Sequence, residues 1–246
     1  MRTFVIIKSK EGIEMINSEF KLLNLQLVIY TPEIYYKKNI ILQKIMESFS
    51  DKFDGDIISF PIPDDAPKEI PRLSLSDSQK KFKFDTSINR ADFHIFLKEP
   101  FEIDTYLSFY FELIQKYIKC TNASIGRMAI VVTKFIEKEN PANFLVKYFG
   151  DKTLAENKQF NDLNDFELHL RKIISLNNFK INSWVRCKNA KVSFGNNKNL
   201  DSVLVIQDMN TFSEEIELKK YSIKNLKEFI NLALDEQSNI LKNIFK

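Results

Sequence analysis

Cysteine and glycine are both scarce in this sequence of 246 residues, and each shortage excludes a class of protein. The two cysteines, Cys120 and Cys187, are isolated and form no CxxC pair, so neither a disulfide framework nor a zinc site is indicated. We interpret both as free thiols in a reducing compartment. The five glycines are too few for phosphate-binding loops, in which the backbone must approach a ligand closely. We therefore expect no cofactor and no metal.

Long hydrophobic runs are absent as well. The apolar stretch at residues 4–7 stops at Lys8, far short of a signal sequence or of the roughly 20 residues that cross a bilayer. No other apolar run in the sequence is long enough to cross a membrane. The expected location is the cytoplasm, without membrane association.

Charge of one sign is not concentrated anywhere in the chain. Lysine and arginine total 36 against 33 for aspartate and glutamate, and the charges are interspersed. A dedicated nucleic-acid-binding protein usually clusters its basic residues on one face or along one segment. The charge pattern therefore favours a protein partner over nucleic acid.

What the sequence does contain is a succession of strand-like segments with alternating apolar and polar residues, interrupted by amphipathic helices. Strands are predicted at residues 3–7, 25–30, 57–60, 72–76, 81–87, 91–97, 124–136, 166–170, 179–185 and 202–208. Helices are predicted at residues 13–23, 37–49, 104–119, 141–149 and 223–244, with N-caps at Asp104, Asn140 and Ser222 and a C-terminal glycine at Gly150. Turns are predicted at Asn177-Asn178 and at Gly195-Asn196-Asn197, the second in a hairpin that leads to the strand at 202–208. The strand at 124–136 is apolar on both faces, which favours a central position in the sheet.

This order of elements predicts an α+β fold with an antiparallel-rich twisted sheet and helices packed on one face. We expect residues 1–246 to form a single unit. Strands that lead into one long helix occur twice, which suggests two similar halves, at about residues 1–120 and 121–246. Within the last helix, Gln237 interrupts the apolar stripe and is expected to approach solvent.

Several short motifs resemble a known family. They comprise the segment Ile62–Leu73 (IPDDAPKEIPRL), the residues Arg90, Asp92 and Phe93, and the tripeptide Ile125-Gly126-Arg127. They are similar to a sporadically distributed family of uncharacterised bacterial proteins, over about two-thirds of the chain. The resemblance implies no reaction, ligand or catalytic residue. A patchy distribution is typical of an accessory gene, for example in a mobile-element or phage-defence locus.

A polar patch is the first candidate site. Arg90, Asp92 and His94 alternate along one predicted strand and therefore share one of its faces. Arg127 begins the strand that follows the next helix. If these strands are neighbours, the four side chains line a patch that can hold an anion or an acidic peptide. The plainer and stronger interpretation is a structural ion pair between Asp92 and an arginine.

A metal-dependent nuclease is the enzyme alternative. Asp208 is followed by Glu217-Leu218-Lys219, and such nucleases often combine an aspartate with a strand-borne Glu-x-Lys that holds Mg²⁺ and a water. In a chain this rich in charge, a solvated strand and turn explains the same residues. The two histidines, His94 and His169, lie in alternating segments without a nucleophile motif and are interpreted as ordinary partly buried side chains.

Nucleic-acid binding is the other alternative. Phe82 and Phe84 alternate with Lys81 and Lys83, which resembles a stacking platform for single-stranded nucleic acid. Alternation explains these rings equally well as core residues, and the glycine-aromatic motif of an RNA-recognition strand is absent. The hypothesis adopted from the sequence is a non-enzymatic binding or accessory protein of a bacterial cytoplasm, which acts through a protein partner encoded nearby.

Overall fold

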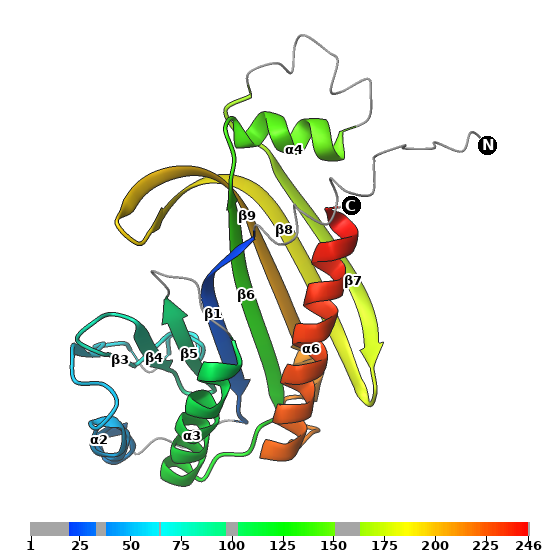
Figure 1. The fold of residues 1–246 in the computed structure, drawn as a ribbon. Coiled ribbons are helices and arrows are strands. Elements are labelled where there is room, and N and C mark those ends of the chain that lie inside the picture. The colour runs from blue at the N-terminus through cyan, green and yellow to red at the C-terminus, as the bar shows by residue number, and fades with distance from the viewer. Residues whose placement is uncertain (1–19, 33–37, 64, 97–102, 151–162, 246) are drawn as a thin grey trace.

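The computed structural model describes residues 20–32, 38–63, 65–96, 103–150 and 163–245, which form one antiparallel sheet of nine strands with four α-helices (Figure 1). The strands are β1 (Lys21–Tyr30), β2 (Ile57–Ser59), β3 (Leu73–Ser76), β4 (Phe82–Thr86), β5 (Arg90–Phe96), β6 (Arg127–Glu137), β7 (Glu167–Leu176), β8 (Phe179–Phe194) and β9 (Asn197–Thr211). The helices are α2 (Lys38–Phe49), α3 (Asp104–Thr121), α4 (Pro141–Phe149) and α6 (Ile223–Ile244), with a short 3₁₀ helix η2 (Ser213–Glu215). The predicted α+β class with an antiparallel-rich sheet is confirmed.

The described residues test only part of the prediction for the N-terminal region. The strand predicted at residues 3–7 and most of the helix predicted at 13–23 lie outside the described residues. The end of that predicted helix is wrong, because β1 already begins at Lys21. The apolar spacing that suggested a helix there continues into a strand that is paired on both sides, and sheet pairing decides the local conformation.

The strand order across the sheet is β2-β3-β4-β5-β1-β6-β9-β8-β7. The central position predicted for residues 124–136 is confirmed, since β6 pairs with β1 on one side and with β9 on the other. β1 lies between β5 and β6 and so joins the early strands to the late strands in one sheet. As a result, residues that are about 100 positions apart in sequence, such as Tyr30 and Arg127, lie directly opposite each other.

One set of alternating strand residues forms the main hydrophobic core. Phe93 on β5 and Leu27 on β1 are register partners and are both buried. α3 packs here: the Phe93 ring lies 6.4 Å from the Tyr110 ring, and the Tyr110 hydroxyl donates a hydrogen bond of 2.8 Å to the Leu25 carbonyl. Burying each large apolar side chain of this kind stabilises the fold by about 1.5–3 kcal/mol.

The last helix, α6, runs along β6, β9 and β8 (Figure 1). Ser222 is the N-cap, as predicted. Its hydroxyl accepts a hydrogen bond of 3.2 Å from the Asn225 backbone N–H, and its own backbone N–H donates a bond of 2.9 Å to the Asn225 Oδ1 atom. The expectation that Gln237 approaches solvent is wrong: this side chain is 2% exposed. Its Nε2 donates to the Gln207 carbonyl at 3.0 Å, so the polar group is buried where a strand carbonyl can accept its proton.

The boundaries of two shorter helices test the predicted caps. α4 spans Pro141–Phe149 with Asn140 and Gly150 at its two cap positions, as predicted, although the Asn140 side chain makes no capping hydrogen bond. The cap predicted for α3 is wrong by one residue, because Asp104 is the first helical residue and Ile103 occupies the N-cap position. None of the helices in the described ranges is both long and apolar enough to span a bilayer.

The β8–β9 hairpin is longer than predicted and bends at its far end (Figure 1). It turns at Gly195, whose φ of 63° is favourable for glycine, and Phe194 pairs with Asn197 across the turn. The Phe194 ring packs 5.1 Å from the ring of Phe135 on β6. Phe135 lies eight residues beyond Arg127 and therefore on the same face of β6. The hairpin end thus folds over the face of the sheet that carries Arg127.

Candidate functional site

The four residues of the predicted polar patch lie on one face of the sheet, here called the polar face. The strands β5 and β6 are not direct neighbours, because β1 separates them. Tyr30 of β1 pairs with Arg90 on one side and with Arg127 on the other. Asp92 and His94 follow Arg90 at alternate positions of β5. The predicted patch therefore includes a tyrosine that sequence reasoning missed.

The ring of Tyr30 lies between the two arginines. The guanidinium carbon of Arg127 is 4.4 Å from the ring centroid and that of Arg90 is 5.3 Å away. Burial raises the pKa of the Tyr30 hydroxyl above its ordinary value of 10.0, although the positive charges of Arg90 and Arg127 act in the opposite direction. The phenol is therefore neutral at pH 7. We call these three residues the arginine–tyrosine stack.

Arg90 is held by a carboxylate, as the plainer interpretation of the sequence requires. Its Nε and Nη2 atoms donate to the two oxygens of Asp92 at 2.7 and 2.6 Å. Gln26 donates a further bond of 2.6 Å to the Asp92 Oδ1 atom. The side chains of Arg90 and Asp92 are 29% and 10% exposed. This forked, largely buried pair fixes the position of Arg90 and neutralises its charge.

Arg127 has a different environment. Its Nε donates to the Thr211 carbonyl at 2.8 Å and its Nη2 to the Asn210 Oδ1 atom at 2.7 Å. Both acceptors are neutral, so these contacts orient the guanidinium without cancelling its charge. Of the two arginines in the stack, Arg127 is therefore the one better able to bind an external anion.

His94 belongs to a second charged group that the sequence analysis did not identify. On β4, Lys83 pairs with Asp85 at 2.7 Å, and the His94 Nε2 lies 3.6 Å from the same carboxylate. Burial lowers the pKa of His94, although the negative charges of Asp92 and Asp85 act to raise it. The imidazole is therefore neutral at pH 7. The alternation of charged residues with Phe82 and Phe84 was the available signal for this group.

The only tryptophan of the chain lies on the same face, on the other side of β9. Trp184 of β8 is half-buried and pairs with Asp208 of β9 and with Arg171 of β7. The guanidinium carbons of Arg171 and Arg186 lie 5.1 and 5.7 Å from the indole ring. We call Trp184, Arg171 and Arg186 the tryptophan cluster. A lone tryptophan at a polar position of an alternating strand was the sequence signal, and it was missed.

A third ring of the polar face also has a basic neighbour. Phe212 directly follows β9, and the Lys180 ammonium lies 5.1 Å from its centroid. Lys180 is exposed and lies on β8 four residues before Trp184, hence on the same face. Three aromatic rings on this face, Tyr30, Trp184 and Phe212, are thus each contacted by one or two cations.

The residues of the nuclease hypothesis are placed differently from the prediction. Asp208 lies on the polar face, where it accepts a bond of 2.9 Å from Asn210. Glu217 and Lys219 are exposed in the turn after η2, so the Glu-x-Lys segment is not strand-borne. β9 ends at Thr211, before this segment begins. Within the described ranges, no three or more histidine, cysteine, aspartate or glutamate side chains are arranged to hold a metal ion.

The rings that resembled a stacking platform face the helices. Phe84 is fully buried, and its ring stacks on Phe49 of α2 at 4.9 Å. Phe82 packs against Phe109 of α3 at 4.6 Å. The interpretation of Phe84 as a core residue is confirmed, and these two rings are not available for stacking on bases.

Two residues in the family-like motifs have clear structural environments. A side chain at Gly126 would place its Cβ within 3 Å of the Ile216 backbone, so only glycine fits where β6 begins. Arg72 ends the proline-rich segment and is 6% exposed. Its Nη2 donates to the Ala66 carbonyl at 3.5 Å, whereas its Nε and Nη1 are buried without a hydrogen-bond partner.

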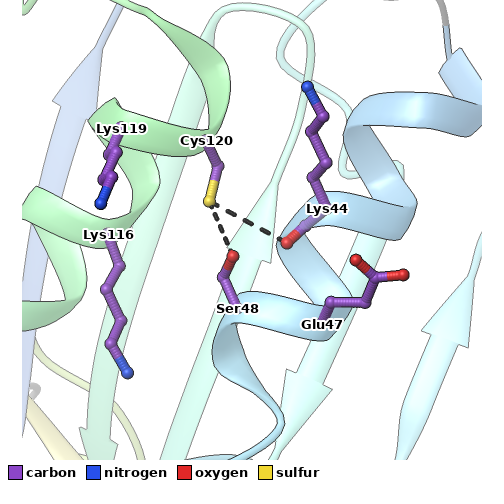
Figure 2. Close-up of a pocket in the computed structure, with 6 residues that line it drawn as sticks. All are labelled: Lys44, Glu47, Ser48, Lys116, Lys119 and Cys120. Carbon is purple, nitrogen blue, oxygen red and sulfur yellow. Dashed lines mark hydrogen bonds between the residues drawn. The ribbon is translucent and has the colours of Figure 1, made fainter.

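A pocket of about 400 Å³ lies between α2 and α3 (Figure 2). It is lined by Lys44, Glu47, Ser48, Lys116, Lys119 and Cys120. The Cys120 thiol is 3.0 Å from the Ser48 hydroxyl, and Lys116 is paired with Asp51 at 2.9 Å. Figure 2 shows the Lys44 ammonium pointing away from those of Lys116 and Lys119. The pocket therefore lacks the converging charges that would hold an anion.

Both cysteines are free thiols. Cys187 is buried under α4 and α6, and burial raises its pKa to about 12. This thiol is therefore protonated and unreactive at neutral pH.

No model of a known protein family matches the sequence, and no curated protein matches it. The polar face itself is therefore the basis for inferring a function.

Proposed function

We propose that this chain is a non-enzymatic binding protein of the bacterial cytoplasm that recognises its partner through the polar face of the sheet. The observation that carries the proposal is the arginine–tyrosine stack, in which Arg127 is oriented by two neutral acceptors and keeps its charge. Such a protein binds negatively charged groups of its partner. An accessory role, in a mobile-element or phage-defence locus, is part of the same proposal and follows from the family resemblance.

The packing of the helices supports this choice of face. Tyr110 of α3 bonds to Leu25, and Gln237 of α6 lies 3.5 Å from the Ile130 carbonyl. Leu145 of α4 belongs to a cluster with Val185. Because strand side chains alternate between the two faces, these contacts support a position of the three helices opposite Arg127 and Trp184. We infer that the helices share one face and that a partner meets the other.

The distribution of charge on the polar face supports an anionic partner. The carboxylates Asp92 and Asp85 are matched by Arg90 and Lys83 on the same face. Arg127 and Arg171 donate to neutral carbonyl or amide oxygens instead. A negatively charged ligand can bind these arginines without breaking a buried ion pair.

The experiment compares two double variants of equal charge in a pull-down from a lysate of the native host. Arg127→Gln with Arg171→Gln alters the polar face, and Lys44→Gln with Lys119→Gln alters the α2–α3 side by the same two charges. Protein in the eluate is read by mass spectrometry and nucleic acid by absorbance. We expect the wild type and the α2–α3 variant to retain the same macromolecule and the polar-face variant to lose it.

Two results contradict the proposal. One is equal retention by both double variants, which shows that the polar face is not the recognition surface. The other is a wild-type protein that retains nothing at low salt. Circular dichroism and a thermal melt of each variant check that the loss is not caused by unfolding.

A further inference from the structure

We infer that the polar face binds single-stranded nucleic acid, with a base stacked on Trp184 and phosphates held by Arg127 and its basic neighbours. This inference rests on the proposed function, because it names the partner of the same surface. The sequence by itself favours a protein partner; the arrangement of rings and cations on the folded sheet favours nucleic acid. Flat rings on an open sheet, each flanked by cations, match the two components of a single strand.

The tryptophan cluster is the strongest part of this surface. Trp184 is half-buried, and Arg171 beside it is exposed and held by one hydrogen bond of 2.8 Å to the neutral Asn182 Oδ1 atom, so the arginine can move away from the ring at the cost of that bond while the ring stays fixed by the strand. A cation at an exposed ring contributes about 2- to 5-fold in an equilibrium constant. A stacked base contributes about 5- to 150-fold. A base therefore replaces Arg171 over the indole with a net gain, and the displaced guanidinium remains close enough to bind a phosphate.

The positions of the rings suit a strand of several nucleotides. Trp184 and Tyr30 are three strands apart across the sheet and four residues apart along it in register, which corresponds to ~20 Å. Phe212 and Lys180 lie at the same end of the sheet as Tyr30, and Arg127 lies between them and the tyrosine. A single strand that crosses the face obliquely can reach the indole of Trp184 near one end and the cations Arg127 and Lys180 near the other.

The acidic residues of the face distinguish a nucleic acid from a simple polyanion. Asp208 pairs with Trp184 in register and accepts a hydrogen bond from Asn210. Its carboxylate repels a phosphate but can accept a hydrogen bond from the exocyclic amino group of a base. The face is thus built for alternating contacts with bases and phosphates. An acidic peptide would use the cations and leave the indole ring unused.

The test uses the purified full chain and a 20-nucleotide oligothymidylate, which forms no duplex. Trp184 is the only tryptophan, so quenching of its fluorescence reports stacking at this residue alone. Fluorescence anisotropy of the labelled oligonucleotide measures the affinity. We expect binding with quenching, and an affinity that falls as salt rises.

Three variants assign the contacts. Trp184→Leu should weaken binding by about 5- to 150-fold, whereas Trp184→Phe, which keeps a ring, should weaken it less. Arg127→Gln should lower the slope of log affinity against log salt by about 0.7. Asp208→Asn, which removes a negative charge, should strengthen binding of oligothymidylate by up to about 5-fold. Lys116→Gln, on the helix side, is the control and should bind as the wild type does.

Several outcomes would overturn the inference. Binding to oligothymidylate without quenching of Trp184, or equal affinity of Trp184→Leu and wild type, excludes stacking on the indole. Equal affinity for a duplex of the same length excludes a single-strand site. Equal affinity for polyglutamate at the same salt makes an acidic protein the partner. If the oligonucleotide does not bind but the polar-face variant still loses a protein from the lysate, the proposed function stands and this inference fails.

Discussion

Neighbouring residues of β5 lie in two different environments, and the difference separates stability from recognition. Phe93 is 1% exposed and packs against the rings of Tyr110 and Tyr117 under α3. Asp92, directly before it, points to the other face and is bonded by Arg90 and Gln26. The first face stabilises the fold by removing apolar surface from water. The second is held by charge-assisted bonds and belongs to the polar face, through which we propose that the chain recognises its partner.

The largest expected effect is the loss of stability on changing Phe93, which lies on the face of β5 that packs against α3. Phe93→Ala should lower the free energy of unfolding by about 3–5 kcal/mol, because the ring is fully buried and its loss leaves a cavity. Urea denaturation followed by circular dichroism measures the change. The folded fraction should bind oligothymidylate as the wild type does, since Phe93 does not face the ligand. A change below 1 kcal/mol would show that this face does not carry the core.

A smaller loss is expected on the polar face. Arg90→Gln should lower the free energy of unfolding by about 1–3 kcal/mol, because Asp92 then keeps only the Gln26 bond in a site where its side chain is 10% exposed. Lys83→Gln is the matched variant. Lys83 is 42% exposed and makes a single bond to Asp85 in place of the fork that Arg90 makes, so its loss should cost less than the loss of Arg90. Equal losses from both variants would show that the forked geometry does not distinguish these two ion pairs.

Gln237 tests whether a buried polar side chain can be replaced by an apolar one where α6 packs against β9. Its Nε2 donates to the Gln207 carbonyl, but its Oε1 is buried without a partner. Gln237→Leu should therefore change the free energy of unfolding by less than about 1 kcal/mol, because the lost hydrogen bond is offset by removal of an unpaired oxygen. Thermal denaturation at neutral pH measures it. A loss of several kcal/mol would assign the amide a larger structural role.

The smallest effect concerns His94 and pH. Burial lowers its folded-state pKa below the ordinary value of 6.5, so the unfolded chain binds this proton more readily than the folded chain does. The corresponding stability is present above pH 6.5 and is lost as the pH falls through the folded-state pKa. His94→Gln should therefore lose less stability than the wild type between pH 7.5 and pH 5.5. Parallel thermal melts at both pH values measure the difference, and identical losses would contradict it.

Most of the regular elements could be predicted from the sequence because their signals are local. The capping residues around α4 and α6 and the turns at Asn177 and Gly195 depend on a few adjacent residues. The end of the first predicted helix and the exposure of Gln237 could not be predicted. Each depends on a partner far away in sequence, namely the strands on both sides of β1 and the Gln207 carbonyl.

The candidate site shows the same limit. Alternation was enough to place Arg90, Asp92 and His94 on one face, and this is what the structure has. The position of Tyr30 between Arg90 and Arg127 could not be predicted, because that contact requires β1 to insert between β5 and β6. The order of residues in the Glu-x-Lys segment matches a nuclease pattern, but β9 ends six residues before Glu217, so the segment is not part of a strand.

Local patterns were sufficient to establish the class of this protein: alternating strands, capped amphipathic helices, free cysteines and no long apolar segment. Each of these depends on composition or on neighbours within one or two turns of the chain. Which rings became core and which came to lie beside cations on the polar face was established by the fold. That choice depends on strand order and register, since a single shift in register moves every side chain of a strand to the opposite face.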